Sequence, residues 1–503
     1  MAVNDGAEPL TVGIVGAGAM GRGIAQVAAT GGVTALIHDS AAGAADAAVD
    51  FAARMLDRQA EKGRMTPDEA ATAKARLVPV AGLEALADCD VVVEAIVEDL
   101  AIKRELFRTL EEIVTAEAVI ASNTSSLRIA SIASACRRRE RIAGMHFFNP
   151  VPLMKLVEVV AAPETSTATT ASLVALGRRL GRVPVVVKDA PGFLVNLGGS
   201  AYTTEGLRIV SEGVATPAQV DAVMRDAAGF RMGPFELMDL TGIDVNFPVR
   251  QIIHAGYFYD RRLATSPLHE SLAQSGRFGR KTGGGFFDYD GDGKKIAPSA
   301  DYRPDVPPAA KLVPAEPDGA LVDLLERAGA EIATADDGAS PLVCAPRSED
   351  CTAVAVRLGL APDRLVAVDL SGGLDKRITV MAAPGADEEV VGAVAARLME
   401  TGAAVTRIKD SPAFIAPRIR AMIANLGCEM AQIGIAAPAD IDTAMKLGLN
   451  YPEGPLELAE AMGARQALDI LAGLQEITGD DRYRPSLWLR RRALLGLPIH
   501  TPD

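Results

Sequence analysis

The sequence repeats itself once, and this repeat constrains the fold more than any other feature of the chain. Three short motifs recur further along: KDAPGF at 188–193 as KDSPAF at 409–414, GVATPAQVD at 213–221 as GIAAPADID at 434–442, and GPFEL at 233–237 as GPLEL at 454–458. Each pair is separated by the same 221 residues. That period is far too long for a solenoid, so the repeat indicates a duplicated domain.

The first segment has the pattern of a parallel α/β domain. Residues 11–15 form an apolar strand pattern that leads into Gly16-Ala-Gly-Ala-Met-Gly21, and an alanine-rich helical run and a strand at 33–37 follow. Short connections of this kind are typical of a parallel sheet. Further strands are expected at 90–96, 118–122, 155–160 and 185–189. From 191 to about 272, apolar residues recur at helical spacing instead, which predicts an all-α domain.

The predicted fold is therefore an α/β Rossmann-type dinucleotide-binding domain followed by an all-α domain, and then a degenerate duplicate of both. The expected boundaries are 1–188 for the Rossmann-type domain, 189–290 for the first helical domain, 291–318 for a Pro-, Asp- and Lys-rich linker, 319–409 for a degenerate partial α/β segment, and 410–503 for the second helical domain. No second glycine-rich loop lies between 319 and 400. The second nucleotide domain is therefore expected to be truncated.

Composition excludes several classes of function. The chain has 51 Lys and Arg against 65 Asp and Glu, a net charge of −14, so binding to nucleic acid or to an anionic membrane surface is not expected as its main role. The five cysteines are scattered and lack the paired spacing of a zinc site, so no metal and no disulfide framework are expected. The N-terminus lacks the pattern of a signal peptide, and no apolar run approaches the ~20 residues of a membrane span. These features together predict a cytoplasmic protein.

The glycine-rich loop stands in the context of a dinucleotide site, with a strand before it and a helix after it. Gly16 permits a tight turn, Gly18 lets the backbone approach a pyrophosphate, and Gly21 permits close packing of helix and strand. Asp39 ends the second strand, where a carboxylate accepts hydrogen bonds from ribose hydroxyls and repels a 2′-phosphate. The pattern predicts NAD rather than NADP. On this motif alone FAD stays possible, as does a structural glycine turn beside a solvated aspartate.

Two further groups of polar residues accompany strands. His146 stands in the run MHFFNP, and Glu158 follows twelve residues later in a strand-like run. A carboxylate paired with imidazole fixes its tautomer and makes it a competent general base. The spacing alone does not decide whether His146 and Glu158 form a catalytic pair, because a lone histidine between apolar residues is more often a hydrogen-bonded core residue than a catalyst. The run Asn123-Thr-Ser-Ser126 ends a strand, where α/β sheets bind ligands, but a helix cap or a simple loop explains it equally well.

Several longer motifs identify a family. The chain resembles the NAD-dependent L-3-hydroxyacyl-CoA dehydrogenases in order over about the first 290 residues, through GAGAMGRGIAQ, VVVEAIVEDLAIKRELF, ASNTSSL, GMHFFNPVPLMKLVEVV, KDAPGFLVN, GPFELMDLTGIDV and GRKTGGGFFDYD. With its tandem copy it resembles the long bacterial form of that family. This resemblance implies a dicarboxylic substrate, 3-hydroxyadipyl-CoA. A straight-chain 3-hydroxybutyryl-CoA is the alternative.

The resemblance also implies a role for each residue of the site. His146 would take the proton of the 3-hydroxyl, with Glu158 as its orienting partner. Ser125 would donate a hydrogen bond to the substrate oxygen, Asn196 would hold the reacting hydroxyl or carbonyl, and Lys62 would meet the phosphates of the acyl-CoA. The NAD site would comprise Gly16, Gly18, Met20, Gly21, Asp39, Glu98, Lys103, Asn123 and Asn149. The family usually has an arginine directly after the asparagine of PGFxVN, where this chain has Leu197.

Two other classes of function are alternatives. A dehydrogenase of the 3-hydroxyisobutyrate or phosphogluconate type would share the domain order, but the HFFNP run followed by Glu158 argues against it. A nucleotide-binding scaffold without catalysis is the second, and the survival of base, orienting residue, serine and asparagine in the first copy argues against that.

The second copy is expected to be catalytically empty. In the 221-residue register Thr379 replaces Glu158 and Pro417 replaces Asn196. Counted from the shared Arg-Ile/Leu strand start at Arg141 and Arg364, Asp369 replaces His146. The retained motifs lie in the helical part, so the second copy is expected to pair with the first as an internal pseudo-dimer, in a chain that is a monomer or a homodimer.

Overall fold

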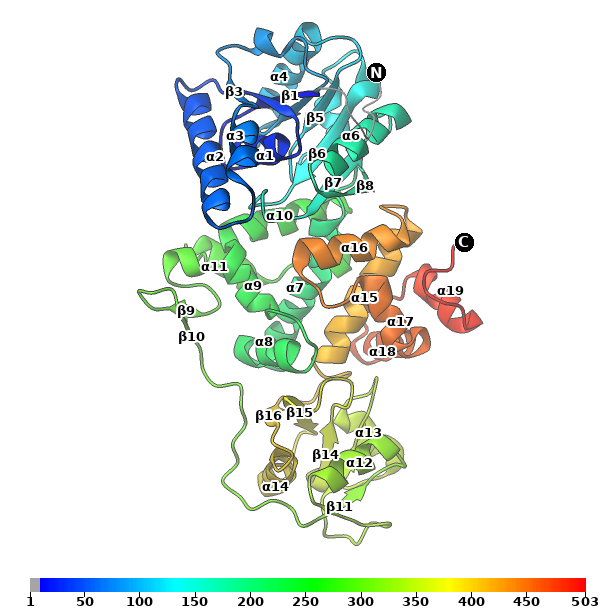
Figure 1. Ribbon diagram of the computed structural model, residues 1–503. Coiled ribbons are helices and arrows are strands. Elements are labelled where there is room, and N and C mark those ends of the chain that lie inside the picture. Colours follow the sequence, from blue (N-terminus) through cyan, green and yellow to red (C-terminus); the bar gives the residue numbers. More distant parts are fainter. Residues whose placement is uncertain (1–9) are drawn as a thin grey trace. The chain divides into compact units, whose positions relative to one another are not determined.

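The N-terminal part of the chain, up to Lys188, is built on an eight-stranded sheet. The computed structural model describes residues 10–503, so most of the N-terminal stretch considered for a signal peptide lies outside the described residues. The strand order is β3-β2-β1-β4-β5-β6-β7-β8, and neighbours run parallel except for the antiparallel β6 and β7 (Figure 1). The strands are β1 (Thr11–Val15), β2 (Thr34–His38), β3 (Leu77–Pro79), β4 (Val91–Glu94), β5 (Val119–Ser122), β6 (Ile142–Phe147), β7 (Leu156–Ala161) and β8 (Val183–Lys188). This is the predicted dinucleotide-binding architecture.

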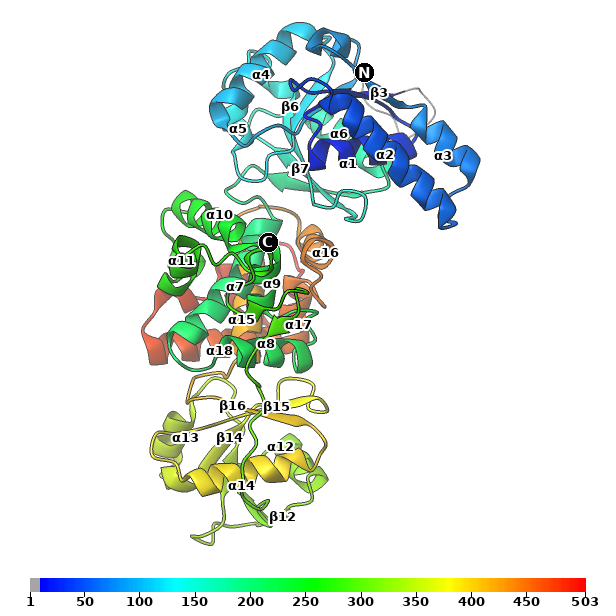
Figure 2. The ribbon, with the colours of Figure 1, turned by 90° about the vertical axis from the view of Figure 1, so that its left-hand side faces the viewer.

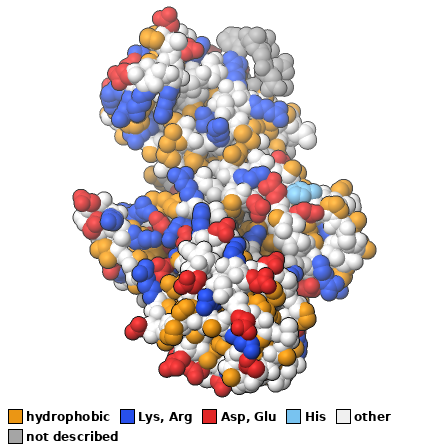
Figure 3. All heavy atoms as spheres, turned by 60° about the horizontal axis from the view of Figure 1, so that its bottom comes forward, with side chains coloured by type: hydrophobic (Ala, Val, Ile, Leu, Met, Phe, Trp, Pro, Cys, Tyr) orange, Lys and Arg blue, Asp and Glu red, His pale blue; other side chains and the backbone are white. Residues whose placement is uncertain are grey.

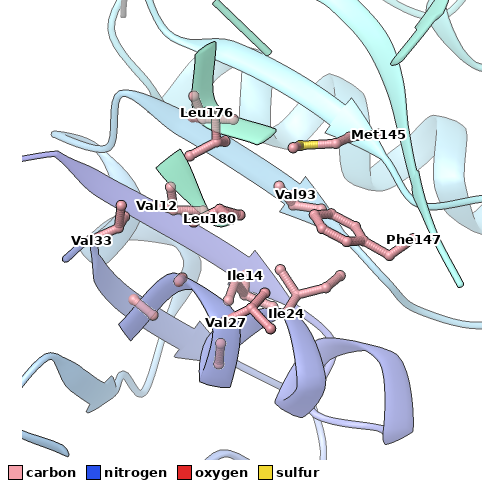
Figure 4. Packing of buried hydrophobic residues seen from close by; sticks show 14 of the residues in the cluster. Val12, Ile14, Ile24, Val27, Val33, Val93, Met145, Phe147, Leu176 and Leu180 are labelled. Carbon is pink, nitrogen blue, oxygen red and sulfur yellow. The ribbon is translucent and has the colours of Figure 1, made fainter. Parts of the chain in front are cut away.

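Helices cover both faces of this sheet. They are α1 (Ala19–Thr30), α2 (Ala44–Glu61), α3 (Pro67–Lys74), α4 (Leu100–Ile113), α5 (Ile129–Ala133) and α6 (Thr167–Arg179). Ile24 and Val27 of α1 and Leu176 of α6 meet Val12 and Ile14 of β1 in one buried cluster (Figure 4). The α4 and α5 helices lie on the other side of the sheet (Figure 2). Because both faces are covered, the central strands carry apolar residues at most positions rather than at alternate ones.

The first helical domain follows, as its apolar spacing predicted. Its helices are α7 (Val195–Ser211), α8 (Pro217–Asp226), α9 (Pro234–Thr241), α10 (Ile243–Gly256) and α11 (Pro267–Gln274), and a small hairpin of β9 (Asp288–Tyr289) and β10 (Lys295–Ile296) comes after them. Asp221 of α8 accepts hydrogen bonds from the backbone N–H groups of Phe235 and Glu236 at the start of α9. The GPFEL motif therefore marks a helix start that a buried carboxylate caps.

A second, smaller sheet corresponds to the second copy. It has the order β12-β11-β13-β14-β15-β16, with α12, α13 and α14 packed around it (Figure 2). Its elements are β11 (Lys311–Pro314), α12 (Gly319–Arg327), β12 (Glu331–Ile332), β13 (Leu342–Cys344), α13 (Cys351–Leu358), β14 (Leu365–Val368), β15 (Arg377–Ala382), α14 (Glu388–Met399) and β16 (Ala404–Arg407). The β11 strand lies inside the segment predicted as a linker, because four strand residues among prolines and alanines show no periodicity. This sheet also opens with a strand, a helix and a parallel strand, β11–α12–β12, but the loop between β11 and α12 has no glycine-rich motif.

The remaining helices repeat those of the first helical domain. They are α15 (Ala416–Gln432), α16 (Pro438–Leu449), α17 (Pro455–Met462), α18 (Ala464–Thr478) and α19 (Leu487–Leu495). The match is close in detail: a Cβ on Gly206 would meet Pro234, and a Cβ on Gly427 would meet Pro455. Both pairs are related by the 221-residue repeat.

The copies exchange one helix. Close contacts divide the chain into two compact units: one runs to Leu197 and also takes in Ile433–Leu449, and the other comprises Gly198–Gln432 and Asn450–Asp503. In the first unit, α16 of the second copy packs on β7 and β8, and the Lys188 N–H donates to the Ile435 carbonyl at 2.8 Å. In the second unit, α8 of the first copy packs on β15.

The same backbone hydrogen bond recurs there with the copies exchanged. The Lys409 N–H donates to the Val214 carbonyl at 3.0 Å. Lys409 and Lys188 are equivalent in the repeat, and so are Val214 and Ile435. Reciprocal contacts of this kind are what a two-fold interface produces.

A buried ionic cluster joins the two sets of helices inside the second unit. Glu205 of α7 accepts hydrogen bonds from Arg418 of α15 at 2.6 Å and from the Tyr483 hydroxyl at 2.9 Å, and it pairs with Arg482 at 2.8 Å. The Glu205 and Arg418 side chains are 0% and 1% exposed. Burial by itself would raise the pKa of Glu205, but Arg482 and Arg418 hold it below its ordinary value of 4.5. The carboxylate is therefore charged and fully partnered.

Charge on the surface is mixed. On the face in Figure 3, the described Lys and Arg side chains are interspersed with Asp and Glu side chains. Among the described helices, none combines the length and apolar character required to cross a membrane. Within residues 10–503 no cluster of three or more His, Cys, Asp or Glu side chains is arranged to hold a metal ion.

Replacing Glu205 tests how much this cluster stabilises the fold. We expect Glu205→Gln to lower the free energy of unfolding by about 3–5 kcal/mol, because it leaves the buried Arg482 guanidinium without a carboxylate and leaves Arg418 with Glu212 alone. Asp469→Asn, which removes an exposed pair with Arg465, should cost about 1 kcal/mol or less. Denaturant unfolding of the full chain measures both. The difference between wild type and Glu205→Gln should shrink as the pH falls through the lowered pKa of Glu205, where the carboxylate is protonated.

Candidate active site

The two residues proposed as a catalytic pair lie opposite each other on neighbouring strands. His146 on β6 is the register partner of Glu158 on the antiparallel β7. Opposite residues of an antiparallel pair present their side chains on the same face, so the imidazole and the carboxylate meet. His146 Nδ1 lies 2.6 Å from Glu158 Oε2, and the two residues are 6% and 1% exposed. His146 and Glu158 are therefore twelve residues apart because they lie on two neighbouring strands joined by a short connection.

The second carboxylate oxygen of Glu158 holds the start of α7. Its Oε1 accepts hydrogen bonds from the backbone N–H groups of Leu194 at 3.1 Å and Val195 at 2.8 Å. The chain turns toward Glu158 at Phe193, which has a φ of 49°, a strained conformation for a non-glycine residue. Glu158 thus joins the sheet, the histidine and the first turn of the helix.

Asn196 and Ser125 come together beside this pair. The Asn196 side-chain amide donates to the Ser125 backbone carbonyl at 3.4 Å. Ser125 follows β5 and Asn196 begins α7, so residues 71 positions apart meet at the carboxyl edge of the sheet. The ring of Phe148 lies 4.5 Å from the imidazole of His146, between centroids. The four predicted catalytic residues therefore all belong to the first unit.

The glycine loop has the geometry that a dinucleotide site needs. Gly16 has a φ of 109°, and a Cβ there would lie 2.5 Å from the Ala95 carbonyl oxygen. A Cβ on Gly21 would lie 1.8 Å from the Gly16 carbonyl oxygen, whereas one on Gly18 would meet no protein atom within 4 Å. Gly18 is the N-cap of α1, so free N–H groups and the positive end of the helix dipole border this open space.

Asp39 borders the same space. Its two carboxylate oxygens accept hydrogen bonds from the Ala17 N–H at 2.7 Å and the Ala41 N–H at 2.8 Å. These bonds fix the carboxylate while leaving lone pairs for ribose hydroxyls. A cavity of about 820 Å³ is lined by Gly16, Gly18, His38, Asp39, Ser40 and a largely apolar wall that includes Leu83, Ile96, Val97, Ile102 and Leu106. A fixed carboxylate beside an apolar wall and a glycine-bordered helix start fits an adenine nucleotide.

Glu98 and Lys103 form a network at the neighbouring strand ends. Lys103 is 1% exposed and pairs with Glu94 at 2.5 Å and Glu98 at 3.2 Å. Glu98 accepts hydrogen bonds from the Thr124 hydroxyl at 2.5 Å and the Ser126 hydroxyl at 2.8 Å. Burial alone would raise the pKa of Glu98, but these hydrogen bonds and the charge of Lys103 lower it. Lys103 is thus buried between two carboxylates and fixes Glu98.

Sequence reasoning missed part of this network. Glu94 is fully buried at the end of β4 and also accepts a hydrogen bond from the Ser122 hydroxyl at 2.7 Å. The available signal was a carboxylate that ends the apolar run VVVE. Thr124 was likewise missed, because its hydroxyl was considered only as part of a polar run.

The other predicted site residues lie in varied surroundings. Asn123 accepts a hydrogen bond from the Phe147 N–H at 2.8 Å and so joins β5 to β6. Asn149 is exposed directly after β6, and Met20 packs against the core in the first turn of α1. Lys62 is exposed at the end of α2, and its side chain has no hydrogen bond or ion pair with any described residue.

Comparison with known proteins assigns the family. The model of the 3-hydroxyacyl-CoA dehydrogenase NAD-binding domain matches residues 11–190, and the model of the C-terminal domain of that family matches 192–289 and again 414–498. The chain belongs to the 3-hydroxyacyl-CoA dehydrogenase family. It is an NAD-dependent oxidoreductase, and the C-terminal domain of the family is present twice.

Individual relatives agree with this assignment. The chain is 36% identical over 489 residues to the 3-hydroxyadipyl-CoA dehydrogenase of Escherichia coli K12, covering 96% of this chain and 98% of the relative. The crystal structure of a 3-hydroxybutyryl-CoA dehydrogenase from E. coli K12 superposes with a TM-score of 0.85 at 35% identity, covering 97% and 99% of the two chains. The human mitochondrial hydroxyacyl-coenzyme A dehydrogenase is 39% identical over 292 residues, which is 55% of this chain and 90% of the human protein.

Two glycine variants separate the roles of the loop in binding and in folding. We expect Gly18→Ala to leave the melting temperature unchanged and to raise the Kd for NADH about tenfold or more, because the added methyl occupies space open to the pyrophosphate. Gly21→Ala should lower the melting temperature as well, because its methyl collides with the Gly16 carbonyl. Thermal unfolding without cofactor and fluorescence titration with NADH measure the two effects. Unchanged NADH affinity in Gly18→Ala would show that the cofactor does not approach this loop.

Proposed function

We propose that this dehydrogenase oxidises (3S)-3-hydroxyacyl-CoA to 3-oxoacyl-CoA at the site formed by His146, Glu158, Ser125 and Asn196. The observation that carries the assignment is the buried 2.6 Å contact of His146 with Glu158 at the strand edge that Asn196 and Ser125 also border. NAD⁺, when bound, accepts the hydride from the hydroxyl-bearing carbon. The chain supplies a base, hydrogen bonds and position.

His146 is the proposed general base. Its Nδ1 is occupied by Glu158, so in the neutral ring the proton sits on Nδ1 and the Nε2 lone pair is left to take the proton of the 3-hydroxyl. Glu158 stabilises the imidazolium that results. In the reverse direction the imidazolium returns this proton to the carbonyl oxygen. Asn196 and Ser125 hold the reacting oxygen next to Nε2.

The remaining contacts to NAD and to the acyl-CoA are proposed from the charge and the position of each residue. Gly16, Gly18, Gly21 and Asp39 bind the adenosine and pyrophosphate of NAD, and Glu98, with Lys103 behind it, borders the nicotinamide half. Met20, Asn123 and Asn149 complete the NAD site. The unpaired, exposed Lys62 and the nearby exposed Arg58 offer cations to the phosphates of the acyl-CoA, which an anionic protein requires locally.

Variants of the catalytic pair test this mechanism. We expect His146→Gln to lower kcat by about 10²–10⁴, the usual contribution of a general base, and to leave NADH affinity unchanged. Glu158→Gln should lower kcat too, because an amide NH₂ facing Nδ1 favours the tautomer that protonates Nε2. His254→Gln, on α10, is the matched control and should retain full activity. Near-normal turnover in His146→Gln would remove the histidine from the mechanism.

The proposed substrate is 3-hydroxyadipyl-CoA, a dicarboxylic thioester. Support comes from the near full-length similarity to the E. coli protein of that name, while the E. coli structure with a TM-score of 0.85 carries the name of a 3-hydroxybutyryl-CoA dehydrogenase. The shared fold and duplication do not separate the two substrates, so the substrate has to be measured.

Oxidation of NADH measures the substrate and cofactor preferences together. We expect kcat/KM to be about tenfold or more higher with 3-oxoadipyl-CoA than with acetoacetyl-CoA, and NADPH to be a poor donor because Asp39 repels its 2′-phosphate. A preference for acetoacetyl-CoA would instead identify a 3-hydroxybutyryl-CoA dehydrogenase. No turnover of either thioester would favour a nucleotide-binding scaffold.

The second copy is proposed to act as the internal partner of the first. The reciprocal hydrogen bonds and the exchanged helices α8 and α16 support an internal pseudo-dimer, in a chain that is a monomer or a homodimer. The five cysteines are buried and form no disulfide, which supports a reducing, cytoplasmic location.

A further inference from the structure

The second copy contains a counterpart of the active site, and strand register identifies its residues. On the second sheet Val368 pairs with Val380, and the Asp369 N–H donates to the Thr379 carbonyl at 3.0 Å. On the first sheet the equivalent rungs are Met145 with Val159 and His146 with Glu158. Asp369 therefore stands where the first copy has His146, and Thr379 stands where it has Glu158, as the repeat predicted.

The same comparison places a third residue. Leu342 pairs with Leu365 as Ile120 pairs with Ile142, so β13 is equivalent to β5. Five residues after Leu342 comes Arg347, the counterpart of Ser125.

A helix cap that occurs in both copies supports the equivalence of β13 and β5. Asp410 accepts hydrogen bonds from the N–H groups of Cys351 and Thr352, as Asp189 accepts them from Ile129 and Ala130.

These counterparts line one cavity inside the second unit. The cavity has a volume of about 280 Å³, and its lining includes Arg347, Asp369 and Pro417, the counterparts of Ser125, His146 and Asn196. Arg420, the counterpart of Gly199 in the repeat, lines it too. We call it the Arg347–Arg420 pocket. It has lost the dehydrogenase chemistry, because neither the base nor its orienting carboxylate remains, and the Thr379 hydroxyl is buried without a partner.

The pocket has gained two cations in place of small residues. Arg420 is 16% exposed and donates to the Ser371 carbonyl at 3.1 Å, while its nearest carboxylate, Glu453, lies 3.9 Å away. Arg347 is exposed and has no hydrogen bond or ion pair from its side chain to any described residue. The Ser371 hydroxyl is a buried donor in the lining. The pocket therefore offers donors that the folded chain leaves unused.

Asp369 is the one carboxyl group in the lining. It is 6% exposed, and burial raises its pKa, while hydrogen bonds from Ser371 and the charge of Arg420 oppose that rise. A carboxyl group in the lining disfavours a doubly charged phosphate more than a singly charged carboxylate. The rest of the lining is mainly apolar, through Leu370, Met462, Ala320, Ala345 and Ala461.

We propose that the Arg347–Arg420 pocket binds the carboxylate of a short aliphatic acid. The two guanidinium groups hold the carboxylate oxygens, the Ser371 hydroxyl donates to one of them, and the aliphatic chain lies against Leu370 and Met462. The small volume admits a few carbon atoms rather than a nucleotide. A free dicarboxylic acid and the carboxylate end of an acyl-CoA present the same chemistry.

Calorimetric titration of the full chain with adipate and with adipyl-CoA tests the proposal. Binding of adipate identifies the free acid as the ligand, and binding of adipyl-CoA that Arg347→Gln weakens identifies the acyl chain. We expect Arg347→Gln and Arg420→Met each to raise the Kd about tenfold or more, since each removes a charged hydrogen-bond donor. Arg490→Gln, an exposed arginine of α19, is the matched control and should leave the Kd unchanged.

Arg347 keeps the test decisive if Arg420→Met fails to fold, because its exposed side chain holds no other part of the structure. Asp369→Asn should bind as tightly as the wild type or more tightly. Binding to the active site of the first copy is distinguished by His146→Gln, which should leave adipate affinity unchanged. The proposal is overturned if neither probe binds, if Arg347→Gln binds both probes as well as the wild type, or if inorganic phosphate binds more tightly than adipate.

Discussion

The carboxylate of Glu158 is the group on which the proposed active site depends. It is buried on β7, accepts two backbone N–H groups at the start of α7, and contacts His146 Nδ1. A buried carboxylate is tolerated only where its oxygens are fully partnered, and here the partners come from three elements. The position of the histidine, the direction of the helix and therefore the place of Asn196 are set by one side chain.

The second copy lacks that carboxylate, and its chemistry differs accordingly. At the equivalent position Thr379 is too short to reach either a base or a helix start, and its hydroxyl remains unpartnered. The bend before the helix nevertheless persists, since Phe414 has a φ of 52° where Phe193 has 49°. The backbone conformation is thus shared by the two copies while the side chains at the site differ, and two arginines line the cavity of the second copy.

Placing both copies in one chain allows each to specialise. A symmetric dimer would need every interface residue to serve on both sides. Here Glu205 and Arg418 form a buried pair, while their counterparts in the repeat are Leu426 and Leu197. The arginine that the family usually carries after the asparagine of PGFxVN is therefore present once, at 418. Each copy contributes one half of the ion pair.

Local physics made much of this protein predictable from the sequence. Strand, glycine loop and helix are adjacent in the chain, so the dinucleotide site was predicted from Gly16, Gly18, Gly21 and Asp39. The two strands that pair His146 with Glu158 are close in sequence, and the 221-residue register located the second copy. Tertiary structure alone decided that α16 covers β7 and β8 while α8 covers β15, that Lys103 is buried between Glu94 and Glu98, and that Arg347 and Arg420 line one cavity. These contacts join residues that are distant in the chain or share no periodicity, so they depend on packing and charge compensation, which no local pattern encodes.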